Sequence, residues 1–201
     1  IVLLATGQTL VIISGGIDLS VGGTLAISGV TSAWMMAEVL GLGITTSGAD
    51  AHGALVIGAL TAVATGLLVG LTNAFLITKL RIVPFVATLS TMGATLGFAI
   101  IISDGMPIGG PNDFSLISPI MPGVIPFSWA VLAVIVVVSI VGLYLHKSRF
   151  GLHTYAIGSN SFAARAAGIN VELHLTKVYG LAGALAGLAG FYVYLRLGAG
   201  S

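Results

Sequence analysis

Long apolar runs separated by short polar stretches divide the chain into six segments. They cover approximately residues 1–14, 19–40, 54–78, 83–102, 127–146 and 178–197. The backbone in hydrocarbon must satisfy its own hydrogen bonds, so each run is predicted to be a helix. A β-barrel strand would alternate apolar and polar residues, and the run from Ala130 to Gly142 does not alternate. The pattern therefore predicts an all-α fold, a polytopic transmembrane helix bundle with about six spans.

The basic residues indicate an orientation. Six of the seven Lys and Arg residues lie in the connections after the third and the fifth segments, and alternation places both connections on one side. These six are Lys79, Arg81, Lys147, Arg149, Arg165 and Lys177. By the positive-inside rule that side is predicted to be cytoplasmic. The opposite connections, 41–53 and 103–126, contain Asp50, Asp104 and Asp113 but no Lys or Arg.

Composition excludes a soluble domain. Hydrophobic residues make up 57% of the 201 positions and charged residues 6%, whereas a soluble domain carries about 25% charged residues. The net charge of +1 gives no basic patch for nucleic acid, and the absence of cysteine excludes disulfides and thiolate metal sites. The chain begins without Met inside one apolar run and ends just past another, so we expect a fragment of a longer chain.

Residues 14–20 interrupt the apolar character near the start of the chain. They form either a tight cytoplasmic turn or a helix break inside the membrane, where freed backbone must face protein or a water-filled cavity. The charged side chain of Asp18 has a high free-energy cost at membrane depth unless it has a partner. We expect it to cap the following helix through amides near Ser20 and Val21, and a role in lining a solute pathway is compatible with this.

Several polar and small residues within the segments have a packing interpretation. Asn73 is predicted first to hydrogen-bond a neighbouring helix, and second to contact a polar solute. Pro84 suits the first turn of a helix. Small residues recur at four-residue spacing in three pairs, which are Gly66 and Gly70, Gly93 and Gly97, and Gly183 and Gly187. This spacing favours close helix packing within the chain over a dimer seam.

The polar stretch 147–177 is predicted to be a docking element. Ser159 or Asn160 can cap a short helix over residues 162–167, which contains Phe162, Ala163 and Ala164, and Gly168 then ends it. A helix that lies on the membrane surface is the alternative.

No catalytic or metal site is predicted. The four histidines do not stand at metal-ligand spacing and are expected to be solvated or interfacial. The chain has no G-x-x-x-x-G-K-[ST] phosphate loop, so it should not hydrolyse ATP itself. No Ser–His pair stands out as a nucleophile and its base, which weakens an intramembrane hydrolase. We therefore expect no cofactor.

Three blocks resemble the permeases of bacterial monosaccharide ABC importers of the ribose, xylose and galactose type. They are SGGIDLSVGG at residues 14–23, GLTNAFLITKLRIVPFVATLSTM at 70–92 and GLHTYAIGSNSFAARAAGI at 151–169. Ala74 and His153 depart from the usual pattern of the family. The resemblance implies one permease domain over 1–201. Within it, 147–177 would be a cytoplasmic coupling loop that docks on the ATPase subunit.

The resemblance also implies site residues, partners and a location. The expected translocation pathway at the helix break is formed by Gly15, Gly16, Asp18, Ser20, Asn73 and Thr88. The expected coupling residues are Asn160, Phe162, Ala163, Ala164, Gly168 and Ile169. Implied partners are an ATP-binding subunit, an external sugar-binding protein, a second permease copy and membrane lipid, in a bacterial plasma membrane. The alternative is a secondary transporter or channel without an ATPase, and the identity of the sugar stays open.

Overall fold

The computed structural model describes residues 1–42, 49–111 and 128–200, without the side chains of residues 49–51. Most of the predicted connection 103–126, with Asp113, and part of the connection 41–53 lie outside the described residues. The helices are α1 (Val2–Ile13), α2 (Val21–Trp34), the π-helix η1 (Met35–Val39), α3 (Ala49–Thr78), α4 (Pro84–Ser103), α5 (Trp129–Lys147), α6 (Arg149–Ser159), α7 (Ser161–Ala166) and α8 (Val171–Leu197). Two-residue strands β1 (Ile108–Gly109) and β2 (Ala199–Gly200) pair antiparallel.

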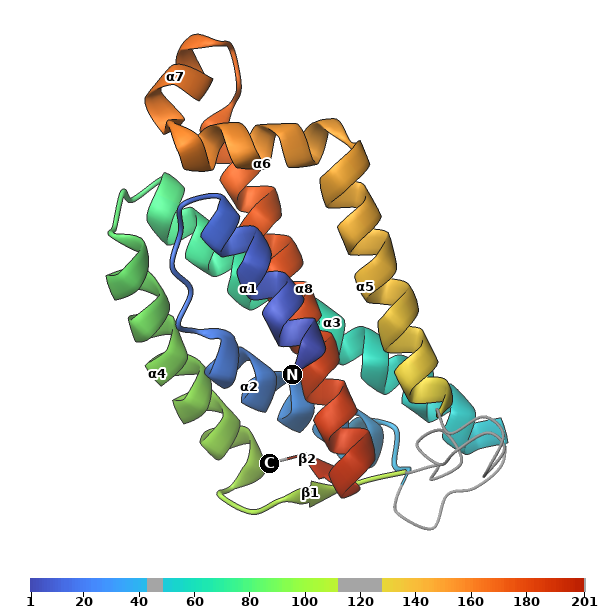
Figure 1. The fold of residues 1–201 in the computed structure, drawn as a ribbon. Helices are drawn as coiled ribbons and strands as arrows, with labels where there is room; N and C mark the ends of the chain where they lie inside the picture. Colours follow the sequence, from blue (N-terminus) through green and yellow to red (C-terminus); the bar gives the residue numbers. More distant parts are fainter. Residues whose placement is uncertain (43–48, 112–127, 201) are drawn as a thin grey trace.

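The predicted helical bundle is confirmed (Figure 1). Among the described residues, four helices are long and apolar enough to cross a membrane: α3 (counted from His52), α4, α5 and α8. The chain is therefore a multi-pass membrane protein. The first two predicted segments form shorter α-helices: α1 has 12 residues, and α2 ends at Trp34, where the π-helix η1 begins.

Glycines bring α3 and α8 into backbone contact. A Cβ on Gly66 would overlap the carbonyl oxygen of Gly183, and a Cβ on Gly187 would overlap that of Ala62. Only residues without side chains permit this approach, which gives the helices dispersion contacts that lipid cannot replace. Packing within the chain is thus confirmed for Gly66, Gly70, Gly183 and Gly187. The same prediction is wrong for Gly93 and Gly97, where an added Cβ would meet none of the described atoms within 4 Å.

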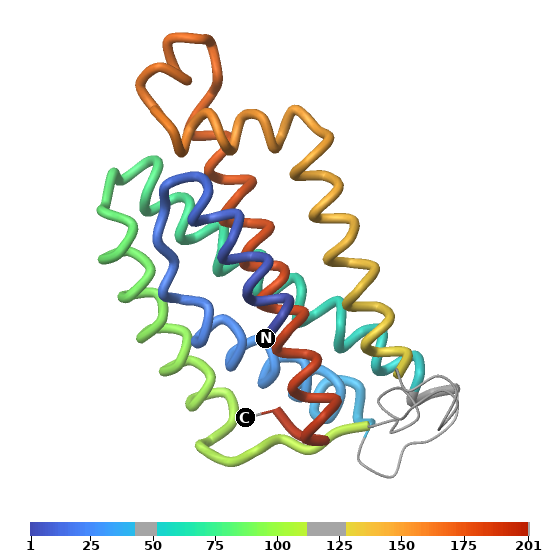
Figure 2. The backbone as a smooth tube through the Cα atoms, in the orientation of Figure 1, coloured from blue at the N-terminus to red at the C-terminus, as the bar shows by residue number. Residues whose placement is uncertain are grey.

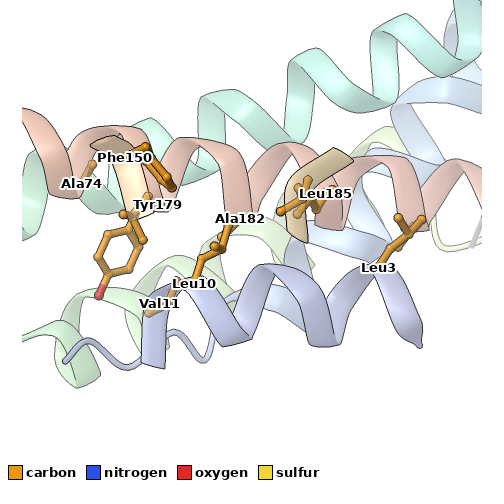
Figure 3. Close-up of a cluster of buried hydrophobic side chains, with 11 residues drawn as sticks. Leu3, Leu10, Val11, Ala74, Phe150, Tyr179, Ala182 and Leu185 are labelled. Carbon is orange, nitrogen blue, oxygen red and sulfur yellow. The ribbon is translucent and has the colours of Figure 1, made fainter. Parts of the chain in front are cut away.

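The largest buried cluster lies where α1, α3, α5 and α6 meet α8. Leu10 of α1 faces Ala182 of α8, and Phe150 of α6 joins the same cluster (Figure 3). Tyr179 extends from α8 towards the last turn of α1. α8 is the most buried of the four spanning helices and α5 the least, so the bundle is organised around α8.

The two ends of the bundle differ. At one end, α6 lies across the helix ends with α7 beyond it, and the short α3–α4 connection reaches the same end (Figure 1). Both basic connections are therefore on one side, as predicted, and we call this the basic end. At the other end, the Tyr194 hydroxyl donates a hydrogen bond to the Pro111 carbonyl, next to the β1–β2 pair.

The stretch 147–177 is more helical than predicted. α8 begins at Val171, seven residues before the predicted start at 178, so the final residues of the stretch belong to a spanning helix. Asn170 caps this helix by accepting a hydrogen bond from the Leu173 amide at 3.0 Å. The prediction that the loop runs to residue 177 is therefore wrong. Charged residues end the apolar run there, but the helix continues through them.

Candidate functional site

The interruption at residues 14–20 is a non-helical segment that is buried at Ser14, Asp18 and Ser20 and exposed at Gly15 and Ile17. α1 ends at Ile13, and the Gly15 and Gly16 amides close its last turn by donating to the carbonyls of Ile12 and Val11. Gly15 has φ +80°, a left-handed conformation that glycine adopts without strain and that ends the helix. The backbone then runs back beside α1 to the start of α2 (Figure 2).

The positions of three contacting side chains indicate how far this segment lies from the basic end of the bundle. Gln8, Asn73 and Thr88 contact it, and they lie five residues before the end of α1, five before the end of α3 and four after the start of α4. At 1.5 Å per residue these positions are about 6–8 Å along each helix from its basic end. The structure therefore favours the break inside the bundle over a turn at its surface.

Side chains from four helices hold the segment. Gln8 of α1 donates to the Asp18 carbonyl at 2.9 Å, and the Tyr179 hydroxyl of α8 donates to the Ile17 carbonyl at 3.4 Å. The Leu19 amide donates to Thr88 Oγ1 of α4 at 3.1 Å. These bonds replace part of the ladder that a continuous helix would supply, as a break at membrane depth requires.

The fourth helix acts through a chain of three polar side chains. Asn73 Nδ2 of α3 donates to Ser20 Oγ at 2.8 Å, and Ser20 Oγ donates to Asp18 Oδ1 at 2.6 Å. The Ser20 amide donates to the same carboxylate oxygen at 2.8 Å. The interhelical hydrogen bond predicted for Asn73 is confirmed. All three residues are buried, and Asn73 Oδ1 has no partner among the described residues.

Asp18 does not cap α2 in the way expected. Ser20 is the N-cap residue, and its side chain makes no capping hydrogen bond. Asp18 instead accepts from the amide two residues ahead, which is an Asx-type turn before the helix. The predicted contact near Ser20 is confirmed, whereas Asp18 as the cap of α2 is wrong. Within the described residues Asp18 has no ion pair, so its carboxyl relies on Ser20 alone.

Two residues of this site were missed from the sequence. Gln8 is a lone amide inside the first apolar run, and Tyr179 lies at the start of the last one. Tyr179 also explains why glycine occupies position 16, because a Cβ there would lie 2.6 Å from the Tyr179 hydroxyl. A polar side chain inside an apolar run could have marked both residues as candidates. Their partners are backbone carbonyls, which no sequence motif identifies.

The second candidate site is α7 with its flanking residues. Asn160, not Ser159, caps this helix by accepting from the Phe162 and Ala163 amides at 3.0 and 2.9 Å. Gly168 ends it with φ +86°, as predicted. The Ile169 amide closes the turn by donating to the Ala164 carbonyl at 3.1 Å.

The exposure of α7 separates its residues into two groups. Phe162 is 84% exposed. Ala164 is only 4% exposed and packs against Ile157 of α6 and Val171 of α8. Ala164 therefore belongs to the internal packing of the segment, whereas Phe162 is open to solvent.

α6 is fastened to the start of α8 by a buried pair. His174 Nε2 and Thr154 Oγ1 lie 2.8 Å apart, and the rings of Phe150 and His153 pack against His174 at 4.8 and 5.7 Å between centroids. His174 is buried, so its interpretation as a solvated or interfacial histidine was wrong.

Comparison with known proteins gives one family over the whole chain. Residues 1–201 match the family described as "Branched-chain amino acid transport system / permease component". The chain is 39% identical over 200 residues to the ribose import permease protein of Bacillus subtilis, covering 97% of this chain and 57% of that protein. It is 37% identical over 198 residues to the galactofuranose transporter permease protein of Escherichia coli, covering 96% and 52%.

A third relative, the D-allose transport system permease protein of Escherichia coli, is 33% identical over 198 residues, covering 98% of this chain and 57% of that protein. The chain thus spans little more than half the length of these relatives. No solved structure matches it.

Proposed function

The chain belongs to this family of transport-system permeases, and from that premise we propose that it is the membrane-spanning subunit of an ATP-driven monosaccharide importer. The observation that carries the proposal is the match along nearly the entire chain to permeases named for ribose, galactofuranose and D-allose. The polar helix break inside an apolar bundle supports it, since a polyhydroxylated solute needs hydrogen-bonding groups at membrane depth.

We assign the translocation pathway to the break and the side chains that hold it. Gly15 and Gly16 start the non-helical segment, Asp18 and Ser20 carry its polar groups, and Asn73 and Thr88 contact it from α3 and α4. A carboxyl group without a cation partner is tolerated at such depth only if it faces polar groups or water in some state of the transport cycle. Asp18 meets this condition if the pathway opens beside it.

Within the stretch 147–177, we assign contact with the coupling partner to α7 and its flanks, which contain Asn160, Phe162, Ala163, Ala164, Gly168 and Ile169. The exposed Phe162 side chain on the short helix α7 suits an apolar groove on a partner. The chain has no phosphate loop of its own, so the proposed partner on the basic side is a separate ATP-binding subunit.

Three further partners complete the assembly: an external sugar-binding protein, a second permease copy and membrane lipid. The proposed location is a bacterial plasma membrane.

Uptake by the full-length protein in proteoliposomes tests this function. With an ATPase subunit and a binding protein, labelled monosaccharide should accumulate with ATP inside and not with a non-hydrolysable analogue. Ionophores that collapse proton and sodium gradients should have no effect. ATP-independent uptake abolished by an ionophore would favour a secondary transporter. Leucine belongs in the substrate panel because the family description names branched-chain amino acids.

The same assay tests the pathway through Asp18→Asn. Asparagine keeps an oxygen that accepts from the Ser20 amide and hydroxyl, so the variant should assemble normally. It removes the charge, and uptake should fall at equal membrane expression. Uptake equal to that of the unmodified protein would remove the carboxylate from the transport mechanism and leave it a purely structural role.

A further inference from the structure

α6 touches the polypeptide at the point where the helix break begins. A Cβ on Gly158, the penultimate residue of α6, would overlap the Ile13 carbonyl oxygen and lie 3.3 Å from the Ser14 carbonyl carbon. A Cβ on Gly15 would lie 3.7 Å from the Gly158 Cα atom. The backbones therefore meet here with no side chain between them, and this contact requires glycine at position 158.

The same helix is tied to the proposed docking element on its other side. Ile157, one residue before Gly158, packs against Ala164 of α7 and Val171 of α8. Asn160, two residues after it, caps α7. A displacement of α7 must therefore move the end of α6, because a close-packed cluster transmits displacement instead of absorbing it.

We propose that Gly158 is the positioning residue through which the coupling segment acts on the helix break. The inference rests on the proposed function and adds where the coupling reaches the pathway. Movement of α6 against Ile13 would change the last turn of α1. The Gly15 and Gly16 amides that close this turn lead directly into the non-helical segment held by Gln8 and Thr88.

The chain provides a matched control on the same helix. A Cβ on Gly151 would overlap the Leu145 carbonyl oxygen, so Gly151 is equally close to a backbone. Its neighbour is α5, not the break. Gly151→Ala and Gly158→Ala therefore add the same group to the same helix in the same kind of contact, and they differ in whether the break is displaced.

The experiment compares the two variants in the full-length transporter with its ATPase subunit. Gly158→Ala should retain the ATPase on purification, because Phe162 stays exposed, and should import about tenfold less substrate per ATP hydrolysed. Gly151→Ala should keep the unmodified ratio. An unchanged ratio in Gly158→Ala, or equal losses in both variants, would overturn the inference.

A second measurement needs no variant. Hydrogen exchange of a peptide spanning residues 13–20 should change when the ATPase subunit in the unmodified complex binds a non-hydrolysable ATP analogue. Unchanged exchange there would also overturn the inference, even if Gly158→Ala failed to insert. Failure of the proposed function itself has a separate signature, because the unmodified protein would then retain no ATPase and show no ATP-dependent uptake.

Discussion

Ser20 is the residue whose removal tests the arrangement of the break most directly. Its hydroxyl donates to Asp18 and accepts from Asn73, so Ser20→Ala deletes two hydrogen bonds with one small change. Among the described residues, the substitution leaves Asn73 Nδ2 without its acceptor, and Asn73 Oδ1 already has no partner there. The side chain of Ser20 makes no capping bond to α2, so no cap is lost.

The expected cost follows from the number and burial of these bonds. Hydrogen bonds between membrane helices contribute about 0.6 kcal/mol on average and up to about 1.7 kcal/mol each. Leaving a buried polar group unpaired costs about 1–3 kcal/mol. In Ser20→Ala the Asp18 carboxylate still accepts a hydrogen bond from the amide of residue 20, so it loses only one of its two hydrogen bonds. We therefore expect Ser20→Ala to lower the free energy of unfolding by about 1–3 kcal/mol.

Ser28 provides the matched control within the same helix. It is fully buried like Ser20, but its hydroxyl has no hydrogen-bond partner among the described residues. Ser28→Ala removes an unpaired polar atom and improves helix propensity, so it should be neutral or stabilising. The assay is reversible unfolding of the full-length protein in mixed micelles, followed by circular dichroism during a titration with SDS.

A double-mutant cycle isolates the Ser20–Asn73 bond. Asn73→Leu removes the donor, and in that background Ser20→Ala should cost less than it does alone, by about 0.5–1.7 kcal/mol. Additive effects would show that the two residues do not interact. Equal costs for Ser20→Ala and Ser28→Ala would refute the assignment of a hydrogen-bonded network to the break.

Two further predictions concern docking and topology. Phe162→Ala should leave unfolding free energy unchanged, because the side chain is exposed, and should reduce co-purification of the ATPase subunit. Unchanged co-purification would make α7 a membrane-surface helix. Single cysteines report orientation in a chain that has none: Met106→Cys should react with an impermeant maleimide from outside, and Ser159→Cys only after permeabilisation. The reverse labelling pattern would invert the topology.

The helical architecture was predictable because the bilayer restricts what an apolar run can do. Runs of about 20 apolar residues leave few alternatives to a spanning helix, and the basic residues indicated which connections share an end. The glycines of α3 and α8 were also interpreted correctly. Gly93 and Gly97 have the same spacing and face nothing described, so spacing predicts the capacity for close packing and not the neighbour.

The errors share a physical cause, which is that sequence patterns do not reveal partners distant in the chain. Gln8 and Tyr179 donate to backbone carbonyls 10 and 162 residues away. Polar residues between 171 and 177 ended the apolar pattern but not the helix, because Asn170 caps α8 and His174 finds Thr154. The burial of Ala164 against Ile157 and Val171 likewise depends on contacts that the sequence pattern did not indicate.

The bonds at the break also indicate which parts of the bundle are free to rearrange. α3 and α8 meet through four glycines with backbone against backbone, and separating them would open voids that nothing else fills. The backbone of the segment makes one hydrogen bond each with Gln8 and Tyr179, which donate, and with Thr88, which accepts; a water or a solute hydroxyl could replace each of these side-chain groups. If the proposed pathway passes beside Asp18, a solute there would compete for these bonds. The α3–α8 pair would meanwhile stay fixed as the frame against which the segment moves.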